Sequence, residues 1–304
     1  MKIFQSSWQN RDGIRLHLQA WEPDGMPKAV VGLLHGLGEH IARYASMAQA
    51  LVKANYAVVG FDLRGHGRSG GRRGHTPSFE ALLDEIDDLR ERIKERHPGR
   101  PVFLYGHSLG GEMALVYALK RKPKIRGVIA TGPWLRAVVP APPLKVAVAR
   151  ALNPILPIYT ERWAQLAQDL SRDPGVRSEF EHDPLVHNLI TARLYLESRE
   201  AGLWALEHAA EFPLPLLLMH GTADKLTSWE ASREFARRLG KRCTWKSWEG
   251  WYHELHNEPA ASRVNQTAIR WMNRQLEVRS PRQAAAGQMR PGMRKSRPLR
   301  RKGV

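Results

Sequence analysis

Short, continuous apolar runs alternate with amphipathic segments along most of the chain. The runs at residues 29–34, 57–61 and 102–105 contain almost only apolar residues and glycine, as strands buried on both faces require. The intervening segments, residues 42–54 and 79–96, place apolar residues at helical spacing among polar ones. This alternation predicts β-α-β units, and therefore a parallel sheet with helices on its faces.

The remaining strands of the predicted sheet show two different patterns. Residues 3–7 and 14–20 alternate apolar and polar positions around an Asn-Arg-Asp-Gly turn, which predicts an antiparallel hairpin at one edge. Further buried-strand patterns lie at residues 125–130, 214–219 and 244–248. We therefore predict a doubly wound, mostly parallel sheet with an antiparallel start.

The alternation of strand and helix patterns stops between residues 132 and 212. Helical patterns at residues 161–170, 184–197 and 201–210 indicate helices there. Several prolines nearby exclude one long amphipathic helix and favour a lid of loops and helices; they are Pro140, Pro142, Pro143, Pro154 and Pro157.

The domain organisation follows from this interruption. Residues 1–132 and 213–278 form the predicted α/β core, and residues 133–212 form a helical cap inserted over the carboxyl edge of the strands, where such sheets bind ligands. The apolar cap residues either enclose an apolar pocket, rest on a lipid surface or pack the cap onto the core; they include Trp134, Leu135, Val138, Val139, Leu152, Ile155, Leu156 and Ile158.

Charge is distributed unevenly over the 304 residues. The net charge is +17, and residues 279–304 carry nine Lys or Arg and no Asp or Glu, which is about half of it. Few large apolar side chains accompany these charges, so the composition predicts a disordered basic tail. Its electrostatics favour unspecific contact with anionic lipid or nucleic acid, and no specific nucleic-acid site is predicted.

Several classes of protein are disfavoured by the composition. Cys243 is the single cysteine, which excludes an internal disulfide and a cysteine-rich zinc site and suits a reducing cytoplasm. Residues 1–9 lack the long apolar segment of a secretory signal. Charged residues and prolines interrupt the most apolar long stretch, residues 133–159, so no transmembrane helix is expected. We expect a cytoplasmic protein, with peripheral membrane contact through the cap or the tail left open and the oligomeric state unpredicted.

The strongest chemical signal is the turn that follows the run at residues 102–105. Gly106-His-Ser-Leu-Gly110 separates this run from a helix-forming segment, residues 112–120. In such a strand–turn–helix arrangement the serine adopts a strained conformation, and the flanking glycines let strand and helix approach closely. Ser108 is therefore the predicted nucleophile.

The order of the remaining polar loops supplies an acid and a base. After a serine in such a turn, the acid and then the histidine follow along the chain. Asp224 comes directly after a buried strand and His253 follows the last strand, so both lie at the same sheet edge as Ser108. His256 competes with His253 for the role of base. Three further acids fall between serine and histidine but lie in the cap, where helix ends and surface charge explain them: Asp169, Asp173 and Asp183.

Two backbone N–H groups are needed to stabilise an oxyanion. Leu109 follows the nucleophile, and Leu37 lies in the loop after the strand that ends at residue 34. His35 is expected to brace this loop. Asp62 and His66 also follow a strand but precede Ser108, so we interpret them as parts of a structural turn.

Five ordered motifs carry a resemblance to a known family. Residues 35–40, 61–69, 106–110, 220–224 and 252–253 resemble the monoacylglycerol lipase and lysophospholipase group of serine α/β-hydrolases over about residues 10–277. Parts of the cap, from residue 171 to residue 187, resemble that group too.

This resemblance implies an α/β-hydrolase fold, with a mostly parallel central sheet flanked by helices and an inserted helical cap. Carried over residue by residue, it makes Ser108 the nucleophile, Asp224 the acid and His253 the base, with Leu37 and Leu109 as oxyanion donors. It implies a serine carboxylester hydrolase for single-chain lipid esters, chiefly monoacylglycerols, with no metal or organic cofactor. A lysophospholipase, a short-chain esterase or thioesterase, and a catalytically silent hydrolase-like binding protein remain alternatives.

Overall fold

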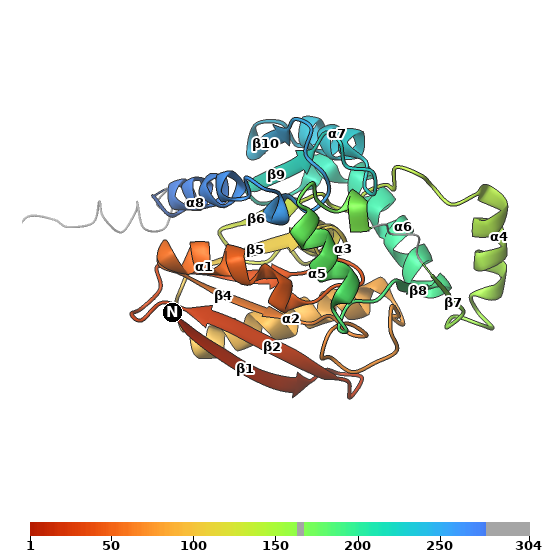
Figure 1. Ribbon diagram of the computed structural model, residues 1–304, viewed down its shortest axis with the longest axis horizontal. Helices are drawn as coiled ribbons and strands as arrows, with labels where there is room; N and C mark the ends of the chain where they lie inside the picture. The colour runs from red at the N-terminus through yellow and green to blue at the C-terminus, as the bar shows by residue number, and fades with distance from the viewer. Residues whose placement is uncertain (163–166, 278–304) are drawn as a thin grey trace, which may run out of the picture.

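A mixed sheet forms the centre of the molecule. The computed structural model describes residues 1–162 and 167–277. Within these residues eight strands form one sheet in the order β1-β2-β4-β3-β5-β6-β9-β10 (Figure 1). β1 and β2 form the predicted antiparallel hairpin and β2 pairs antiparallel with β4, whereas the remaining pairs are parallel. The strands are β1 (Lys2–Gln9), β2 (Arg15–Glu22), β3 (Ala29–Leu34), β4 (Tyr56–Phe61), β5 (Val102–His107), β6 (Gly127–Thr131), β9 (Leu216–Gly221) and β10 (Cys243–Trp248).

Burial explains the two kinds of strand pattern. Every residue of β3, β4, β6 and β9 is buried, since helices cover both faces of the central strands. In β1, at the edge, Trp8 is the one buried residue. The prediction of a doubly wound, mostly parallel sheet is confirmed.

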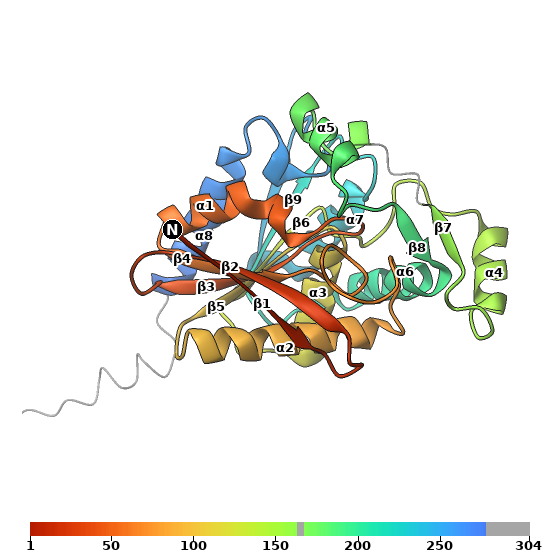
Figure 2. The same ribbon diagram turned by 60° about the horizontal axis from the view of Figure 1, so that its bottom comes forward.

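Helices cover the sheet in two layers (Figure 2). α1 (Ala45–Lys53) and α8 (Ser262–Glu277) pack on one face, in one apolar cluster with alternate residues of the central strands. α2 (Phe79–Arg96), α3 (Leu109–Arg121) and α7 (Trp229–Leu239) contribute to the cluster on the other face. A short 3₁₀ turn, η1 (Ile41–Tyr44), precedes α1.

Between β6 and β9 the chain leaves the sheet; we call residues 133–212 the insertion. In it, α6 packs against α3, whereas α4 and β7 project away from the sheet (Figure 1). Among the described residues, no helix combines the length and the apolar character needed to cross a bilayer. The insertion contains α4 (Pro143–Leu152), β7 (Thr160–Arg162), η2 (Ala167–Asp169), α5 (Pro174–His182), β8 (Leu189–Thr191), α6 (Ala192–Glu207) and η3 (Ala209–Glu211).

The helix predictions for the insertion are wrong in their bounds. β7 and η2 occupy the described part of residues 161–170, while residues 163–166 lie outside the described residues. The helix predicted over residues 184–197 begins only at Ala192, because β8 pairs with β7 and the Thr191 side chain caps α6. The pattern at residues 201–210 belongs mainly to the same helix. α4 and α5 are additional helices, and the predicted basic tail lies outside the described residues.

Candidate active site

Ser108 lies between β5 and α3, in a turn with strained backbone. Its φ of 53° and ψ of −117° are rare for a residue with a side chain, and such strain concentrates at functional sites. A Cβ added to Gly106 would lie 2.1 Å from the Gly110 carbonyl oxygen, so the turn can close only with glycine there. The strand–turn–helix arrangement predicted around Ser108 is therefore present.

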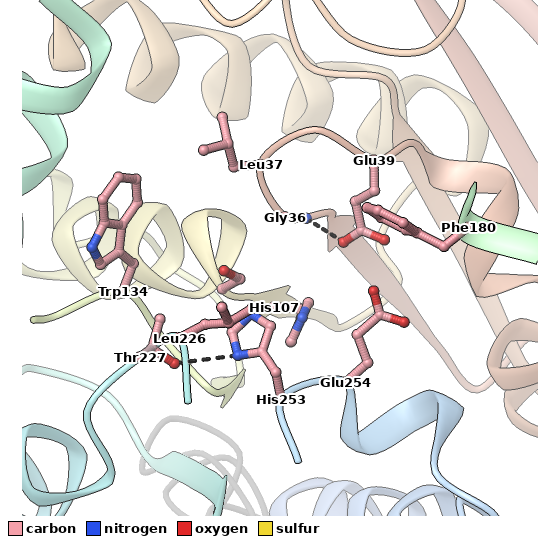
Figure 3. A pocket seen from close by; sticks show the side chains of 11 residues that line it. Gly36, Leu37, Glu39, His107, Trp134, Phe180, Leu226, Thr227, His253 and Glu254 are labelled. Atoms are coloured by element: carbon pink, nitrogen blue, oxygen red, sulfur yellow. Dashed lines mark hydrogen bonds between the residues drawn. The ribbon is translucent and has the colours of Figure 1, made fainter. Parts of the chain in front are cut away.

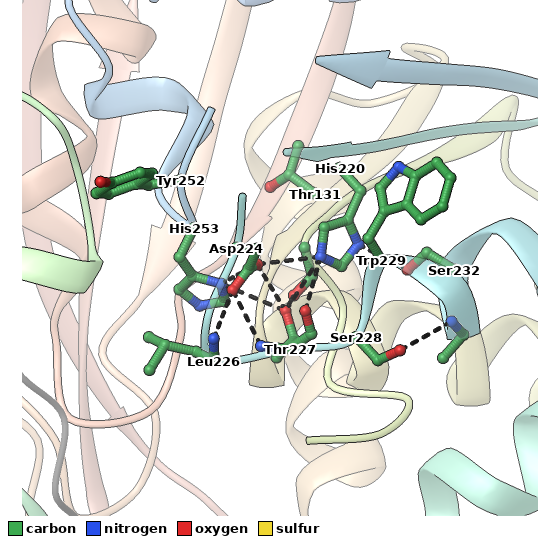
Figure 4. Close-up of polar contacts among 12 residues, drawn as sticks. Thr131, His220, Asp224, Leu226, Thr227, Ser228, Trp229, Ser232, Tyr252 and His253 are labelled. Atoms are coloured by element: carbon green, nitrogen blue, oxygen red, sulfur yellow. Dashed lines mark hydrogen bonds and ion pairs between the residues drawn. The ribbon is translucent and has the colours of Figure 1, made fainter. Parts of the chain in front are cut away.

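Asp224 and His253 meet although 29 positions separate them. His253 Nδ1 lies 2.7 Å from Asp224 Oδ2, in a buried contact (Figure 4). Asp224 comes from the turn after β9 and His253 from the loop after β10, two parallel neighbours whose carboxyl ends share one edge. His256 instead stacks on Tyr44, with ring centroids 4.3 Å apart.

Four further groups hold the Asp224 carboxylate. Its Oδ1 accepts the backbone N–H groups of Leu226 at 2.7 Å and Thr227 at 3.0 Å. Its Oδ2 accepts the Thr227 hydroxyl at 2.9 Å and lies 3.0 Å from His220 Nε2. Although burial opposes charge, the contacts with His253 and His220 hold the pKa of Asp224 well below its usual value. The spacing of the motifs does not indicate these supporting roles of His220 and Thr227.

The environment of His253 favours its protonated form. Burial alone would lower the pKa of His253, but the adjacent Asp224 carboxylate outweighs burial and raises it above the ordinary value. A negative partner on Nδ1 leaves Nε2 as the nitrogen that can accept a proton. The pair can therefore work as a general base that is stabilised once it becomes charged.

Ser108 and His253 line one pocket, together with the loop after β3 (Figure 3). A Cβ added to Gly36 in this loop would lie 3.1 Å from the Ser108 Cβ, and one added to Gly110 would lie 2.3 Å from the Leu34 carbonyl oxygen. The backbones around Leu37 and Leu109 therefore flank the serine. The other lining residues are Glu39, His107, Trp134, Phe180, Leu226, Thr227 and Glu254.

The residues interpreted as structural do brace the neighbouring turns. His35 Nδ1 donates to the Gly36 carbonyl at 2.7 Å and Nε2 accepts the Leu63 N–H at 2.8 Å. Asp62 accepts the backbone N–H groups of Ile41 and Arg68, both at 2.8 Å. These contacts agree with the prediction that His35 and Asp62 shape loops.

The three acids of the insertion lie apart from the pair of Asp224 and His253. Asp169 pairs with Lys225 at 3.0 Å. Asp173 caps α5 by accepting the Gly175 N–H at 2.8 Å. Asp183 contacts His40 Nε2 at 2.8 Å. Each side chain thus has a local partner of its own.

A buried charged cluster forms one wall of the pocket, and the motifs do not predict it. Arg43 contacts Glu39 Oε2 at 3.2 Å and Glu254 Oε2 at 2.7 Å. Burial would raise the pKa of Glu254, but Arg43 outweighs it and lowers this pKa. Burial and the nearby Glu254 raise the pKa of Glu39. Glu39 and Glu254 line the pocket (Figure 3), so their carboxylate oxygens can accept hydrogen bonds from hydroxyl groups of a ligand.

Comparison with known proteins is consistent with this geometry. Residues 25–260 match the family described as serine aminopeptidase, S33. A monoacylglycerol lipase of Mycolicibacterium smegmatis is 32% identical over 271 residues, which cover 88% of this chain and 96% of that protein. An uncharacterized abhydrolase domain-containing protein of Dictyostelium discoideum is 34% identical over 265 residues; the match covers 86% of this chain and spans 28% of that longer protein.

A solved structure supports the same assignment. The crystal structure of Paleococcus ferrophilus monoacylglycerol lipase superimposes with a TM-score of 0.77 at 33% identity, over 90% of this chain and 100% of that one. Fold and sequence identity thus agree over most of the chain. The chain therefore belongs to the serine aminopeptidase S33 family of α/β-hydrolases, and it is similar to monoacylglycerol lipases over most of its length.

Proposed function

We propose that the protein is a serine hydrolase that cleaves single-chain lipid esters, with monoacylglycerols as its main substrates. The observation that carries this proposal is the buried contact between Asp224 and His253 at a pocket that also contains Ser108 on its strained turn. Two similar proteins, from Mycolicibacterium smegmatis and Paleococcus ferrophilus, are monoacylglycerol lipases, which supports the choice of a lipid ester.

The mechanism is two-step acyl transfer. Ser108 Oγ attacks the ester carbonyl while His253 Nε2 takes its proton and then passes that proton to the leaving alcohol. Water activated by His253 attacks the acyl-enzyme, which releases the fatty acid and regenerates Ser108. The lowered pKa of Asp224 keeps its carboxylate charged. This carboxylate fixes the tautomer of His253 and stabilises the protonated form of the ring.

The N–H groups of Leu37 and Leu109 stabilise the oxyanion of each tetrahedral intermediate. Both belong to backbone segments that flank Ser108. They act on charge that develops only in the transition state, and each such donor contributes about 3–4 kcal/mol.

The pocket walls favour a glycerol ester over a phospholipid. Trp134 and Leu226 provide apolar surface for an acyl chain, whereas the Phe180 ring packs on Arg43 beside Glu39 (Figure 3). On the opposite wall, two carboxylates share one guanidinium, Arg43. A phosphate there would lie near the charge of Glu254, whereas glycerol hydroxyls can donate to these carboxylates. Charge thus selects monoacylglycerol over lysophospholipid.

The insertion is the proposed cap, and residues 1–132 with 213–278 are the proposed core. Apolar side chains of the projecting part face solvent, among them Val139, Leu144 and Ile155. Such a surface suits transient contact with the membrane that holds the substrate. We place the enzyme in the cytoplasm, peripherally attached to that membrane, and the basic tail can add electrostatic attraction to anionic lipid.

Hydrolysis of a matched set of substrates tests the proposal. Purified protein is assayed on a monoacylglycerol, a lysophospholipid, a triacylglycerol and a p-nitrophenyl butyrate, each beside Ser108→Ala. We expect preference for the monoacylglycerol, and loss of at least a thousandfold in kcat in the variant, because the nucleophile is absent. Unchanged thermal unfolding of Ser108→Ala is the control for folding.

Two results would contradict the proposal in different ways. Hydrolysis retained by Ser108→Ala would remove the site assignment. Activity on the butyrate ester alone, lost in the variant, would keep the site and remove the lipid substrate.

A further inference from the structure

The insertion is hydrogen-bonded to the loops around the active site, not only to the surface of the core. At its start, the Ser228 N–H donates to the Arg136 carbonyl at 2.9 Å and the Val138 N–H donates to the Leu226 carbonyl at 3.0 Å, beside Asp224. Further on, the Glu254 N–H donates to the Leu170 carbonyl at 2.7 Å, one residue after His253. The loops that carry acid and base are thus tied to the insertion.

The insertion also contacts the loop that carries Leu37. Residues 183–191, which we call the strap, run against residues 36–40 of that loop. The His187 N–H donates to the Gly38 carbonyl at 2.8 Å. Gly38 has a φ of +79°, and a Cβ added to it would lie 2.2 Å from the His187 carbonyl oxygen, so the two backbones touch. The approach requires glycine at this position.

Asp183 fastens the start of the strap to the same loop. Its Oδ2 lies 2.8 Å from His40 Nε2, and its Oδ1 accepts the Leu185 N–H at 2.8 Å, which closes a turn in the strap. Burial would raise the pKa of Asp183, but these two hydrogen bonds outweigh it and lower the pKa. The carboxylate therefore joins strap and loop in its charged form.

The His187 side chain fixes the strap from the other side. Its Nδ1 accepts the Leu189 N–H at 3.2 Å, so Nε2 carries the proton and donates to the Gly65 carbonyl at 3.0 Å. Burial lowers the pKa of His187 to about 4, which keeps the ring neutral at physiological pH. The strap is thus held on two separate loops of the core.

The loop is held on both sides of Leu37. The peptide that carries the Leu37 N–H is fixed through its own carbonyl, that of Gly36, which accepts from His35 Nδ1 at 2.7 Å, and the Gly38 carbonyl accepts from the strap at 2.8 Å. The core and the strap together therefore set the direction of the Leu37 N–H. An oxyanion donor works only when it points at the developing charge, so this direction matters for catalysis.

We propose that Asp183 is a positioning residue, which acts through His40 and the strap to direct the Leu37 N–H at the oxyanion. This inference rests on the proposed function and adds a role for the insertion: its strap completes the oxyanion site from outside the core.

Asp183→Ala tests the proposal on soluble p-nitrophenyl butyrate, with active sites counted by a fluorophosphonate probe. We expect kcat per labelled site to fall at least tenfold with KM within twofold, since a loosened donor loses part of the 10²–10³-fold effect of one donor. Affinity for a boronic acid, which mimics the tetrahedral intermediate, should fall by the same factor as kcat/KM. Asp183→Asn, which keeps an acceptor for the Leu185 N–H, should recover part of the loss.

Asp173→Ala is the matched control, because it removes an aspartate that caps α5 in the same insertion. It should leave kcat and boronic-acid affinity unchanged. The double variant of His40→Ala and Asp183→Ala should lose no more than the single Asp183 variant, because both break one contact.

The inference is overturned if Asp183→Ala lowers the melting temperature but leaves kcat per labelled site and boronic-acid affinity unchanged. It is likewise overturned if the fold-loss in kcat of the double variant equals the product of the losses of His40→Ala and Asp183→Ala. Hydrolysis that Ser108→Ala retains would contradict the proposed function instead, so the two failures are distinguishable.

Discussion

α3 and α4 are both apolar helices, but their apolar residues face opposite environments. Eleven residues of α3 are buried, from Leu109 to Leu119, whereas Val146 is the one buried residue of α4. α3 lies between the sheet and α6, and α4 projects from the far end of the insertion (Figure 1). Apolar character alone therefore does not distinguish a helix that stabilises the fold from one that faces outward.

The apolar surface around α4 is extensive. Val139 is 80% exposed, and Leu144 and Ile155 are each 77% exposed. Side chains so exposed gain little free energy on folding, because burial is what makes an apolar group stabilising. The apolar residues of α3 are therefore explained by their contribution to stability. Those of α4 are not, and the proposed membrane contact accounts for them.

The largest expected effect is on stability, at Leu115 in α3. Leu115→Ala removes a fully buried side chain and leaves a cavity, so we expect the free energy of unfolding to fall by about 2–5 kcal/mol. Val148→Ala, at an exposed position of α4, should change it by no more than about 0.5 kcal/mol. Urea denaturation of both variants measures the difference, and equal effects would break the comparison.

The next effect is on activity, at the surface of α4 and its flanking loops. Replacing Val139, Leu144 and Ile155 together with serine should lower hydrolysis of monoacylglycerol in neutral vesicles at least tenfold, since three apolar side chains no longer enter the bilayer. Turnover of soluble p-nitrophenyl butyrate and the melting temperature should stay unchanged.

Exposed apolar residues far from α4 provide the control for this triple variant. Ile3 and Met26 are also exposed, and serine at both positions should leave vesicle activity intact. If the control loses as much activity as the triple variant, the effect reflects general surface polarity and α4 has no special role.

A smaller effect, on pH dependence, comes from a carboxyl group buried in α3. Glu112 is fully buried, and burial raises its pKa well above 4.5. The native state thus keeps a proton that the unfolded chain releases. Stability should therefore fall as pH rises above about 4.5, by at most about 1.4 kcal/mol per pH unit.

Glu112→Gln removes this titration. Urea denaturation between pH 5 and pH 8 should show that the variant gains stability relative to wild type as pH rises. Glu91→Gln, on the exposed side of α2, should keep the wild-type slope. Parallel slopes for wild type and Glu112→Gln would show that α3 does not hold a neutral carboxyl.

The sequence predicts the sheet and the helices packed on it, such as α3, better than the insertion that contains α4. The central strands are buried on both faces, so their apolar runs are continuous, and the loops after them present Ser108, Asp224 and His253 in a fixed order. These features depend on local pattern plus one topological rule, the shared carboxyl edge of parallel strands.

In the insertion, tertiary contacts decide where helices begin and end. Residues 184–191 read as helical, but the contacts of Asp183 with His40 and of His187 with Gly38 hold this segment as a turn followed by a short strand. The first pair is 143 positions apart. Local periodicity carries no information on such pairs, so neither the strap nor the wall formed by Glu39, Arg43 and Glu254 could be predicted.

The smallest effect is expected from the basic tail, which offers another explanation of membrane contact. Its nine positive charges attract anionic lipid, and this attraction is screened by salt. Removing residues 279–304 should leave turnover of p-nitrophenyl butyrate, and of monoacylglycerol in neutral vesicles, within twofold of the full chain. On vesicles with phosphatidylserine, the full chain should hydrolyse monoacylglycerol faster than the truncated chain at low salt, and this difference should disappear at high salt. If the truncated chain instead fails on neutral vesicles while the α4 triple variant retains activity, the tail provides the membrane contact and the exposed face of α4 needs another explanation.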